Sequence, residues 1–198
     1  MDRILNKLLD TLFPPRDSEL LLRTALDTPV SIETGCYEGI FYCANYTNPK
    51  IHAAINENKF HNNPRAQKIL ASLISAWIDQ KQLVDVCFIP IPLGKNRQRN
   101  RGHNQVLSVL QQTSFPVQSV LHRVRETSPQ VSLNRQQRLH NIKDIFEVDD
   151  HELASLTGKT LIILDDVITT GATLNEARAT LTPHLPPDTQ LICLALAH

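Results

Sequence analysis

The sequence predicts an α/β fold whose parallel sheet carries helices on both faces. From residue 84 onward, short apolar runs alternate with segments of helical periodicity, which is typical of parallel sheets. Of the 198 residues, 41% are hydrophobic and 20% are charged, so the chain can bury an ordinary globular core. The formal net charge is zero, which argues against a global field that attracts nucleic acid or an anionic membrane.

The N-terminal part shows little strand character. Residues 1–13 place apolar side chains on one face of an amphipathic helix, and their interspersed charges are unlike a signal peptide. Residues 16–36 show no firm periodicity, whereas residues 39–46 alternate as a strand does. Because no apolar run reaches membrane-spanning length, we expect a cytoplasmic protein without membrane insertion.

Two Asn-Pro pairs predict where the next helices begin. Asn48 and Asn63 can each cap a helix whose first residue is proline, since proline suits the first helical position. The first of these helices is expected over residues 49–60. In the second, apolar residues recur at helical spacing and indicate a core-facing stripe formed by Leu70, Leu73, Ile74, Trp77 and Ile78.

The second half of the chain supplies most of the expected sheet. Residues 122–143 interrupt it, because they are polar and basic and have no sustained periodicity. The predicted strands are 84–92, 115–121, 160–164 and 190–197, and the predicted helices are 104–112 and 173–181.

The four cysteines do not form a metal or disulfide pattern. Cys36, Cys43, Cys87 and Cys193 include no CxxC pair, which argues against a zinc ribbon and a disulfide scaffold. Cys87 and Cys193 lie in apolar runs and are expected to be buried free thiols. Cys36 and Cys43 with a histidine could be imagined as metal ligands, but their spacing departs from the known ligand patterns.

Residues 161–174, LIILDDVITTGATL, raise a chemical question, because two acids follow a buried strand side by side. Carboxylates at a strand end can accept hydrogen bonds from two ribose hydroxyls. A loop of small residues that leads into a helix offers N–H groups to a phosphate. The stretch therefore predicts a ribose 5-phosphate site formed by Asp165, Asp166, Thr169, Thr170, Gly171, Ala172 and Thr173.

Other interpretations of this stretch explain less. A Walker-type nucleotide enzyme requires GxxxxGK[ST], and the TGKT at residues 157–160 has Leu153 at the first glycine position and leads into a strand. No GxGxxG occurs either. An acidic turn that only caps a helix accounts for one acid but poorly for two acids and three threonines.

Basic residues are concentrated between residues 95 and 143. Nine lysines and arginines occur there against Glu126 alone. A charge block is usually a solvated surface, but this one follows a predicted strand end, where open α/β sheets bind ligands. Guanidinium groups suit the oxygens of a pyrophosphate.

The stretch 161–174 closely resembles the phosphoribosyl-pyrophosphate (PRPP) signature of type I phosphoribosyltransferases. Residues 89–105, IPIPLGKNRQRNRGHNQ, and residues 123–146, RVRETSPQVSLNRQQRLHNIKDIF, resemble two blocks of the ComF family, the competence-associated branch. Residues 37–60 are a fainter match. The resemblance implies a type I phosphoribosyltransferase-like domain over 37–198 and a small N-terminal hood segment over 1–36.

The chain departs from the ComF pattern in two places. Family members usually carry a four-cysteine zinc module after FPPR, but FPPR at residues 13–16 is followed here by DSEL. We therefore expect no zinc. His103 stands where the family usually has an aromatic residue, and we expect it to pack in a similar way.

The resemblance also implies a role for the basic block. Residues 94–102 correspond to the pyrophosphate loop and residues 123–142 to a mobile loop that closes over the ligand. Arg97 and Arg99 are expected nearest the tip of the first loop, where they are freer to meet DNA. The expected pyrophosphate-binding residues are Lys95, Arg97, Arg101, Asn104 and Gln105.

The expected catalytic residues are Asp165, Asp166, Arg138 and Asn141, and Mg²⁺ is expected to be carried by PRPP near the two aspartates. The resemblance implies a PRPP-binding protein that supports DNA uptake in natural transformation and transfers phosphoribosyl to an acceptor. Its partners would be PRPP, single-stranded DNA and the competence helicase machinery. The alternatives are a non-catalytic PRPP-binding or DNA-handling factor and a nucleobase salvage phosphoribosyltransferase.

Overall fold

The computed structural model describes residues 14–25, 32–125 and 143–198. The expected N-terminal helix over 1–13 and the expected catalytic residues Arg138 and Asn141 lie outside the described residues.

A five-stranded sheet forms the centre of the molecule, in the order β1-β2-β7-β6-β3. Strands β2, β7, β6 and β3 run parallel, and β1 pairs antiparallel with β2. The sheet is therefore mainly parallel, as the sequence predicts. The strands are β1 (Gly35–Tyr37), β2 (Ile40–Ala44), β3 (Val86–Pro90), β6 (Thr160–Val167) and β7 (Gln190–Ala197).

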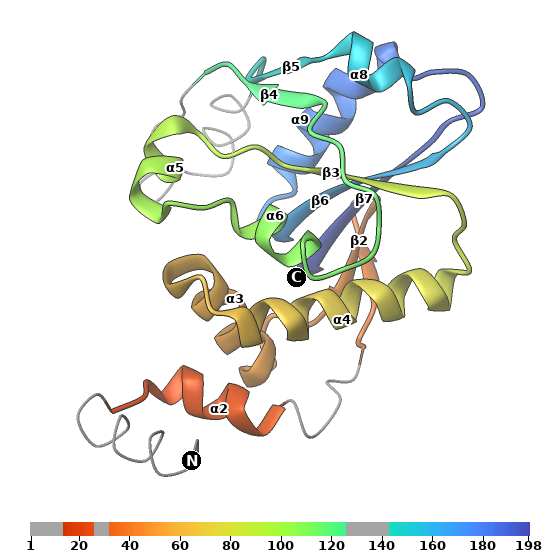
Figure 1. Ribbon diagram of the computed structural model, residues 1–198. Coiled ribbons are helices and arrows are strands. Elements are labelled where there is room, and N and C mark those ends of the chain that lie inside the picture. The colour runs from red at the N-terminus through yellow and green to blue at the C-terminus, as the bar shows by residue number, and fades with distance from the viewer. Residues whose placement is uncertain (1–13, 26–31, 126–142) are drawn as a thin grey trace.

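Helices cover both faces of this sheet (Figure 1), which confirms the predicted layers. Side chains of β6 alternate between two cores, because successive residues of a strand point to opposite faces. One face of the sheet is covered by α3 (Pro49–His61), α4 (Pro64–Lys81) and α6 (Gln105–Leu110), and the other by α8 (Asp150–Ala154) and α9 (Ala172–Leu181). Ile162 and Leu164 pack on the first of these faces, whereas Leu161 and Ile163 pack on the second.

The helix starts that follow the Asn-Pro pairs are confirmed. Asn48 Oδ1 accepts a hydrogen bond from the Lys50 N–H at 3.0 Å, and Asn63 Oδ1 accepts one from the Arg65 N–H at 2.9 Å. The stripe predicted on α4 is buried along its whole length. No helix in the described ranges is long and apolar enough to cross a membrane.

The strand predicted over residues 115–121 is wrong. The chain meets β3 only at a bridge between Phe88 and Val117, where Phe88 N donates to Pro116 O and Gln118 N donates to Phe88 O. Extending this parallel ladder one way needs an N–H at Pro90, and extending it the other way needs one at Pro116. Because proline has no N–H, pairing stops on both sides.

Several further elements were not anticipated. After the bridge the chain forms β4 (Leu121–Arg123), which pairs with β5 (Phe146–Val148) in a separate sheet. Strand β1 precedes β2 in a tight hairpin and crosses the expected boundary between residues 36 and 37. The expected pyrophosphate loop contains a helix, α5 (Lys95–Arg101).

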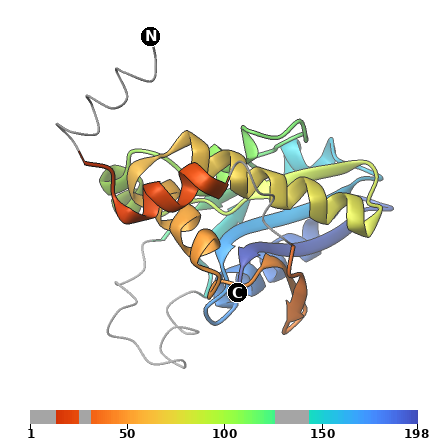
Figure 2. The ribbon, with the colours of Figure 1, turned by 90° about the horizontal axis from the view of Figure 1, so that it is seen from below.

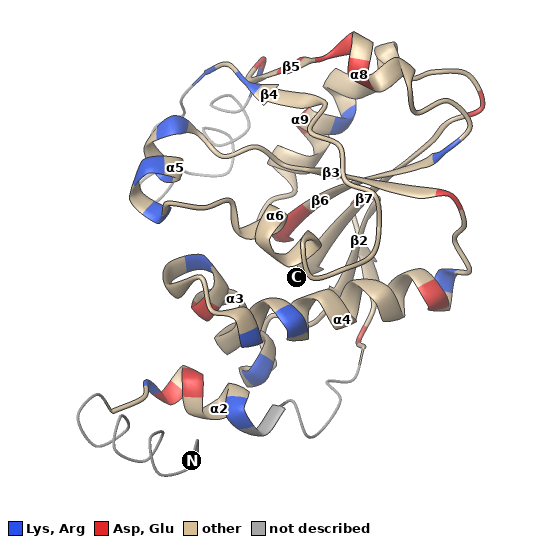
Figure 3. Ribbon diagram, in the orientation of Figure 1, with Lys and Arg blue, Asp and Glu red and all other residues tan. Residues whose placement is uncertain are grey.

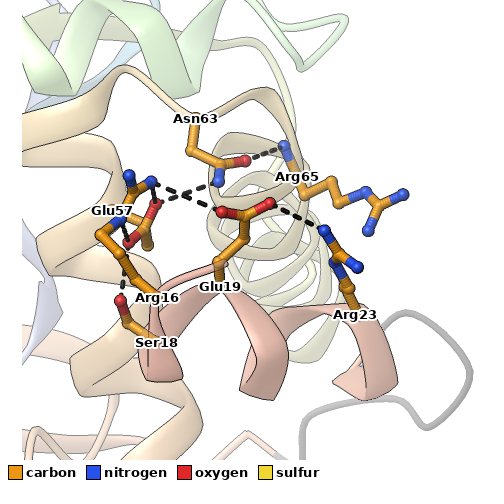
Figure 4. A network of polar contacts seen from close by, with 7 residues as sticks. All are labelled: Arg16, Ser18, Glu19, Arg23, Glu57, Asn63 and Arg65. Atoms are coloured by element: carbon orange, nitrogen blue, oxygen red, sulfur yellow. Dashed lines mark hydrogen bonds and ion pairs between the residues drawn. The ribbon is translucent and has the colours of Figure 1, made fainter. Parts of the chain in front are cut away.

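Helix α2 (Asp17–Ala25) forms an outer layer against α3 and α4, away from the sheet (Figures 1 and 2). A buried carboxylate on α3 holds it there (Figure 4). Glu57 is 1% exposed and accepts from Arg16 Nε and Nη2 at 2.8 and 2.7 Å and from Ser18 Oγ at 2.6 Å. Asn63 Nδ2 donates to it at 3.1 Å. The pKa of Glu57 is lowered to about 2, mainly by the hydrogen bonds from Arg16.

We predict that Glu57→Gln loosens α2. The folded-state pKa of Glu57 lies below its ordinary value, so its stabilising effect is present above that ordinary value and disappears as pH falls through about 2. At neutral pH the substitution should lower the free energy of unfolding by about 2 kcal/mol, since it leaves buried donors poorly matched. Hydrogen exchange of the α2 amides should accelerate.

Glu19→Gln is the matched control. Glu19 also pairs with Arg16 and Arg23, at 3.7 and 3.3 Å, but its side chain is 28% exposed. An exposed pair of this kind contributes about 0.5 kcal/mol. Equal effects of the two substitutions would contradict the anchoring role of Glu57.

Candidate functional site

The candidate site lies where the parallel strands end, on the side reached by α3 and α5. Figure 3 shows acidic residues at the end of β6 and a cluster of basic residues on α5. A cleft of about 240 Å³ connects them and also reaches Tyr46 and Lys59. Open α/β sheets bind ligands at this edge.

A larger concavity of about 1020 Å³ lies between α2, α3 and α4. Arg16 and Arg23 line it, but their charges are held by Glu57 and Glu19 (Figure 4). None of its lining residues lines the cleft that contains the two aspartates, so its size alone does not make it the candidate site.

The adjacent aspartates point to different surroundings, because β6 turns successive side chains to opposite faces. Asp166 is 8% exposed and lies on the side of α3 and α6. Its Oδ2 accepts from Gln105 Nε2 at 2.9 Å and contacts Lys59 Nζ at 3.1 Å. Asp165 accepts the backbone N–H of Asp166 through its Oδ1 at 2.8 Å.

The negative charge of Asp165 is offset by fewer partners than the charge of Asp166. Burial, followed by the neighbouring charge of Asp166, raises its pKa to about 7. The Asp166 N–H and the more distant charges of Lys59 and Arg97 act in the opposite direction. Asp165 therefore holds a proton more readily than an ordinary aspartate does.

The loop after β6 leads directly into α9. Gly171 has a φ of 69°, a left-handed conformation that glycine adopts without strain, and α9 begins at the next residue. A Cβ at this position would lie 2.8 Å from Ile40 Cδ1, so the loop also needs glycine for space. A small hollow of about 20 Å³ is lined by Asp165 and by residues 167–174, which include the predicted threonines. The positive end of α9 faces this loop and favours an anion.

Helix α5 divides its basic residues between two faces. Arg97 and Arg101, one turn apart, both line the cleft. Lys95 and Arg99, also one turn apart, fall on the opposite face by helical geometry, and neither is among the cleft-lining residues. The expectation that grouped Arg97 with Arg99 at the loop tip does not describe Arg97, because α5 is a helix and Arg97 lines the cleft.

The expected pyrophosphate-binding residues are only partly brought together. Arg97, Arg101 and Gln105 line the cleft, whereas Lys95 and Asn104 do not. Asn104 caps α6, accepting from Val106 N at 2.9 Å, and donates to Ile91 O at 3.0 Å. Gln105 is 3% exposed and supports Asp166.

His103 has a hydrogen-bonding role that the sequence does not predict. Its Nδ1 lies 2.9 Å from Arg101 O, and its Nε2 lies 2.8 Å from Asn58 O. The ring therefore joins the end of α5 to the last turn of α3. Expecting His103 to pack as an aromatic residue does not account for these two polar contacts.

Among the polar and charged residues of the cleft, the sequence did not predict Tyr46, Lys59 and Arg123 as site residues. Tyr46 and Lys59 lie in residues 37–60, which gave a faint family match, and Lys59 lies near the end of that segment. Arg123 is the first residue of the basic ComF-like block over 123–146, so this block held a usable signal for Arg123. Cys87 and Cys193 are buried free cysteines, as predicted.

A family model for the phosphoribosyl transferase domain matches residues 58–197. The chain belongs to this family. The match covers the cleft residues on α3, α5 and β6, and it agrees with the mainly parallel sheet.

Curated relatives indicate which members of this family the chain resembles. The chain is 31% identical over 120 residues to "Competence protein ComFC" of Streptococcus pneumoniae, covering 61% of this chain and 51% of that protein. It is 34% identical over 134 residues to "Competence protein F" of Haemophilus influenzae, covering 62% and 57%. It is 30% identical to "DNA utilization protein YhgH" of Shigella flexneri, covering 54% and 47%. The predicted ComF resemblance is confirmed, and the chain spans about half the length of these relatives.

Among solved structures, the chain is similar to an enzyme titled as the allosteric regulatory enzyme of purine biosynthesis. The overlap covers 70% of this chain and 30% of that one, with 13% identity and a TM-score of 0.41.

We predict that Asp165→Asn stabilises the empty protein at alkaline pH. Because the folded-state pKa of Asp165 is raised, the folded protein is more stable at low pH, where this carboxyl group is protonated. That part of the stability is lost as pH rises through about 7. An amide cannot ionise and still accepts the Asp166 N–H. Denaturant unfolding at about pH 8 should show a gain of about 2 kcal/mol over the unsubstituted protein, and a far smaller gain at about pH 5.

Glu147→Gln on the exposed face of β5 serves as the control, since it removes one carboxylate without touching the cleft. It should leave the difference between the two pH values unchanged. A flat response of Asp165→Asn would show that burial of this carboxyl is not a source of instability.

Proposed function

We propose that this chain binds PRPP together with Mg²⁺ in the cleft at the end of β6. The observation that carries the proposal is that three features meet around Asp165. This residue lines the hollow at the anion-favouring start of α9, and it also lines the cleft that contains Asp166 and the arginine pair of α5. PRPP carries three matching groups, which are a 5-phosphate, a ribose diol and a pyrophosphate.

The residues present fit the expected metal. Mg²⁺ is usually held by one or two carboxylates together with phosphate oxygens of a substrate, and Asp165 and Asp166 supply such carboxylates. When bound, Mg²⁺ would offset charge on the pyrophosphate. The protein's own contribution is to accept hydrogen bonds from the ribose hydroxyls and to hold the pyrophosphate with guanidinium groups.

The reaction that this arrangement supports is phosphoribosyl transfer. The bond between the ribose carbon and the pyrophosphate oxygen breaks, its electron pair leaves with pyrophosphate, and an acceptor atom bonds to the same carbon. The carboxylates stabilise the positive charge that develops on this carbon, while Arg97 and Arg101 bind the departing pyrophosphate. The names of the curated relatives suggest that the activity serves competence or DNA use, and we include that role in the proposal. Release of pyrophosphate on incubation with PRPP and a pool of nucleobases would separate transfer from binding alone.

The assignment of the two aspartates predicts the effect of removing both charges. Asp165→Asn combined with Asp166→Asn should weaken Mg²⁺-dependent PRPP binding by at least about 100-fold, because charged hydrogen-bond acceptors are lost. Calorimetric titration with PRPP measures this directly. Unchanged affinity would remove the ribose-binding role, and Glu147→Gln is again the control for loss of a carboxylate.

The two faces of α5 predict a contrast among arginines. Arg97→Ala and Arg101→Ala should each weaken PRPP binding about tenfold, since each removes a charged donor from the cleft. Arg99→Ala removes the same charge from the opposite face of the same helix and should change affinity by less than about twofold. Three equal losses would mean that α5 acts only through its overall charge.

A further inference from the structure

Lys59 holds a defined position inside the cleft. Its Nζ lies 3.1 Å from Asp166 Oδ2, and the two side chains are 17% and 11% exposed. Lys59 also lines the cleft that contains Arg97 and Arg101. The ammonium group therefore contacts the proposed ribose-binding carboxylate and lies in the same cleft as the proposed pyrophosphate-binding arginines.

The backbone beside Lys59 is fixed on two sides. Asn58, which is 1% exposed, donates through Nδ2 to Gln105 O at 2.8 Å. Asn58 O in turn lies 2.8 Å from His103 Nε2. A lysine side chain loses much rotamer freedom when it is ordered, so a position that already holds it avoids that loss when a ligand binds.

Lys59 can serve Asp166 and a ligand together. An ammonium group has three N–H donors, so the contact with Asp166 leaves it able to donate to a ligand oxygen as well. Asp166 is nearly buried and would be destabilised if its cation left. A contact that bridges Asp166 and the ligand is thus more favourable than one that abandons Asp166.

The charges of the cleft leave a surplus for an anion. Lys59, Arg97, Arg101 and Arg123 line it against Asp165 and Asp166, an excess of two positive charges when both acids are ionised. Without Lys59 this excess would be halved. The lost charge would also be the one nearest to Asp166.

We propose that Lys59 is a PRPP-binding residue that bridges Asp166 and the pyrophosphate, and that it carries part of the charge compensation otherwise left to Mg²⁺. This inference rests on the proposed function. It implies that the protein retains measurable PRPP affinity without a divalent ion and that this residual affinity depends on Lys59.

Titrations with PRPP, in EDTA and in saturating Mg²⁺, test the inference on the full chain. Lys59→Met keeps the length of the side chain but removes its charge, and it should lose at least about tenfold in affinity in EDTA. The loss should be smaller in Mg²⁺. Lys59→Arg should recover most of the metal-free affinity, and melting curves of the empty variants would show that they are folded.

Lys68→Met on the exposed side of α4 is the matched control, because it removes one lysine charge outside the cleft. It should behave as the unsubstituted protein does. If Lys59→Met matches Lys68→Met in both buffers, or loses the same factor in both, the bridging role is overturned while the proposed function stands. If the unsubstituted protein does not bind PRPP even in Mg²⁺, the proposed function fails and this inference fails with it.

Discussion

The carboxylate of Asp166 lies at the end of the buried strand β6, where a charge is unfavourable unless partners offset it. Lys59 from α3 and Gln105 from α6 provide those partners. Because both must reach the same oxygen, the last turn of α3 and the first turn of α6 are fixed against the strand end. His103 and Asn58 add backbone contacts between the same segments. The cleft is thus shaped by the contacts that one buried carboxylate makes with α3 and α6.

The surroundings of Asp165 differ from those of Asp166, and this difference explains why the two aspartates can be neighbours. Strand geometry turns them to opposite faces, so that only Asp166 receives a lysine directly. Asp165 keeps a raised pKa because burial and Asp166 both oppose its charge. Its destabilisation in the empty protein is the kind of strain that ligand hydroxyl groups relieve. Functional sites commonly retain such locally unfavourable groups.

The sequence was sufficient to predict those parts of the structure that neighbouring residues determine. The Asn-Pro caps of α3 and α4 and the apolar run of β6 can be recognised from neighbouring residues alone. It was insufficient where two distant segments meet. Pairing stops on both sides of the Phe88–Val117 bridge because Pro90 lies on one side of it and Pro116 on the other, which no single segment reveals. Helix α5 has no buried residue, so its sequence lacks the apolar periodicity from which a helix could have been predicted. Without that helix, the sequence could not indicate that Arg97 faces the cleft.

Three successive residues at the end of α3 connect parts of the molecule that have separate roles. Glu57 holds the outer helix α2, Asn58 holds the start of α6, and Lys59 holds Asp166. Successive residues of a helix point about 100° apart, so one turn can contact three neighbours at once. A displacement of α2 that pulled on Glu57 would therefore act on the turn that positions Lys59. Helix α2 is in this way connected to the cleft through the last turns of α3, although none of its described residues lines the cleft.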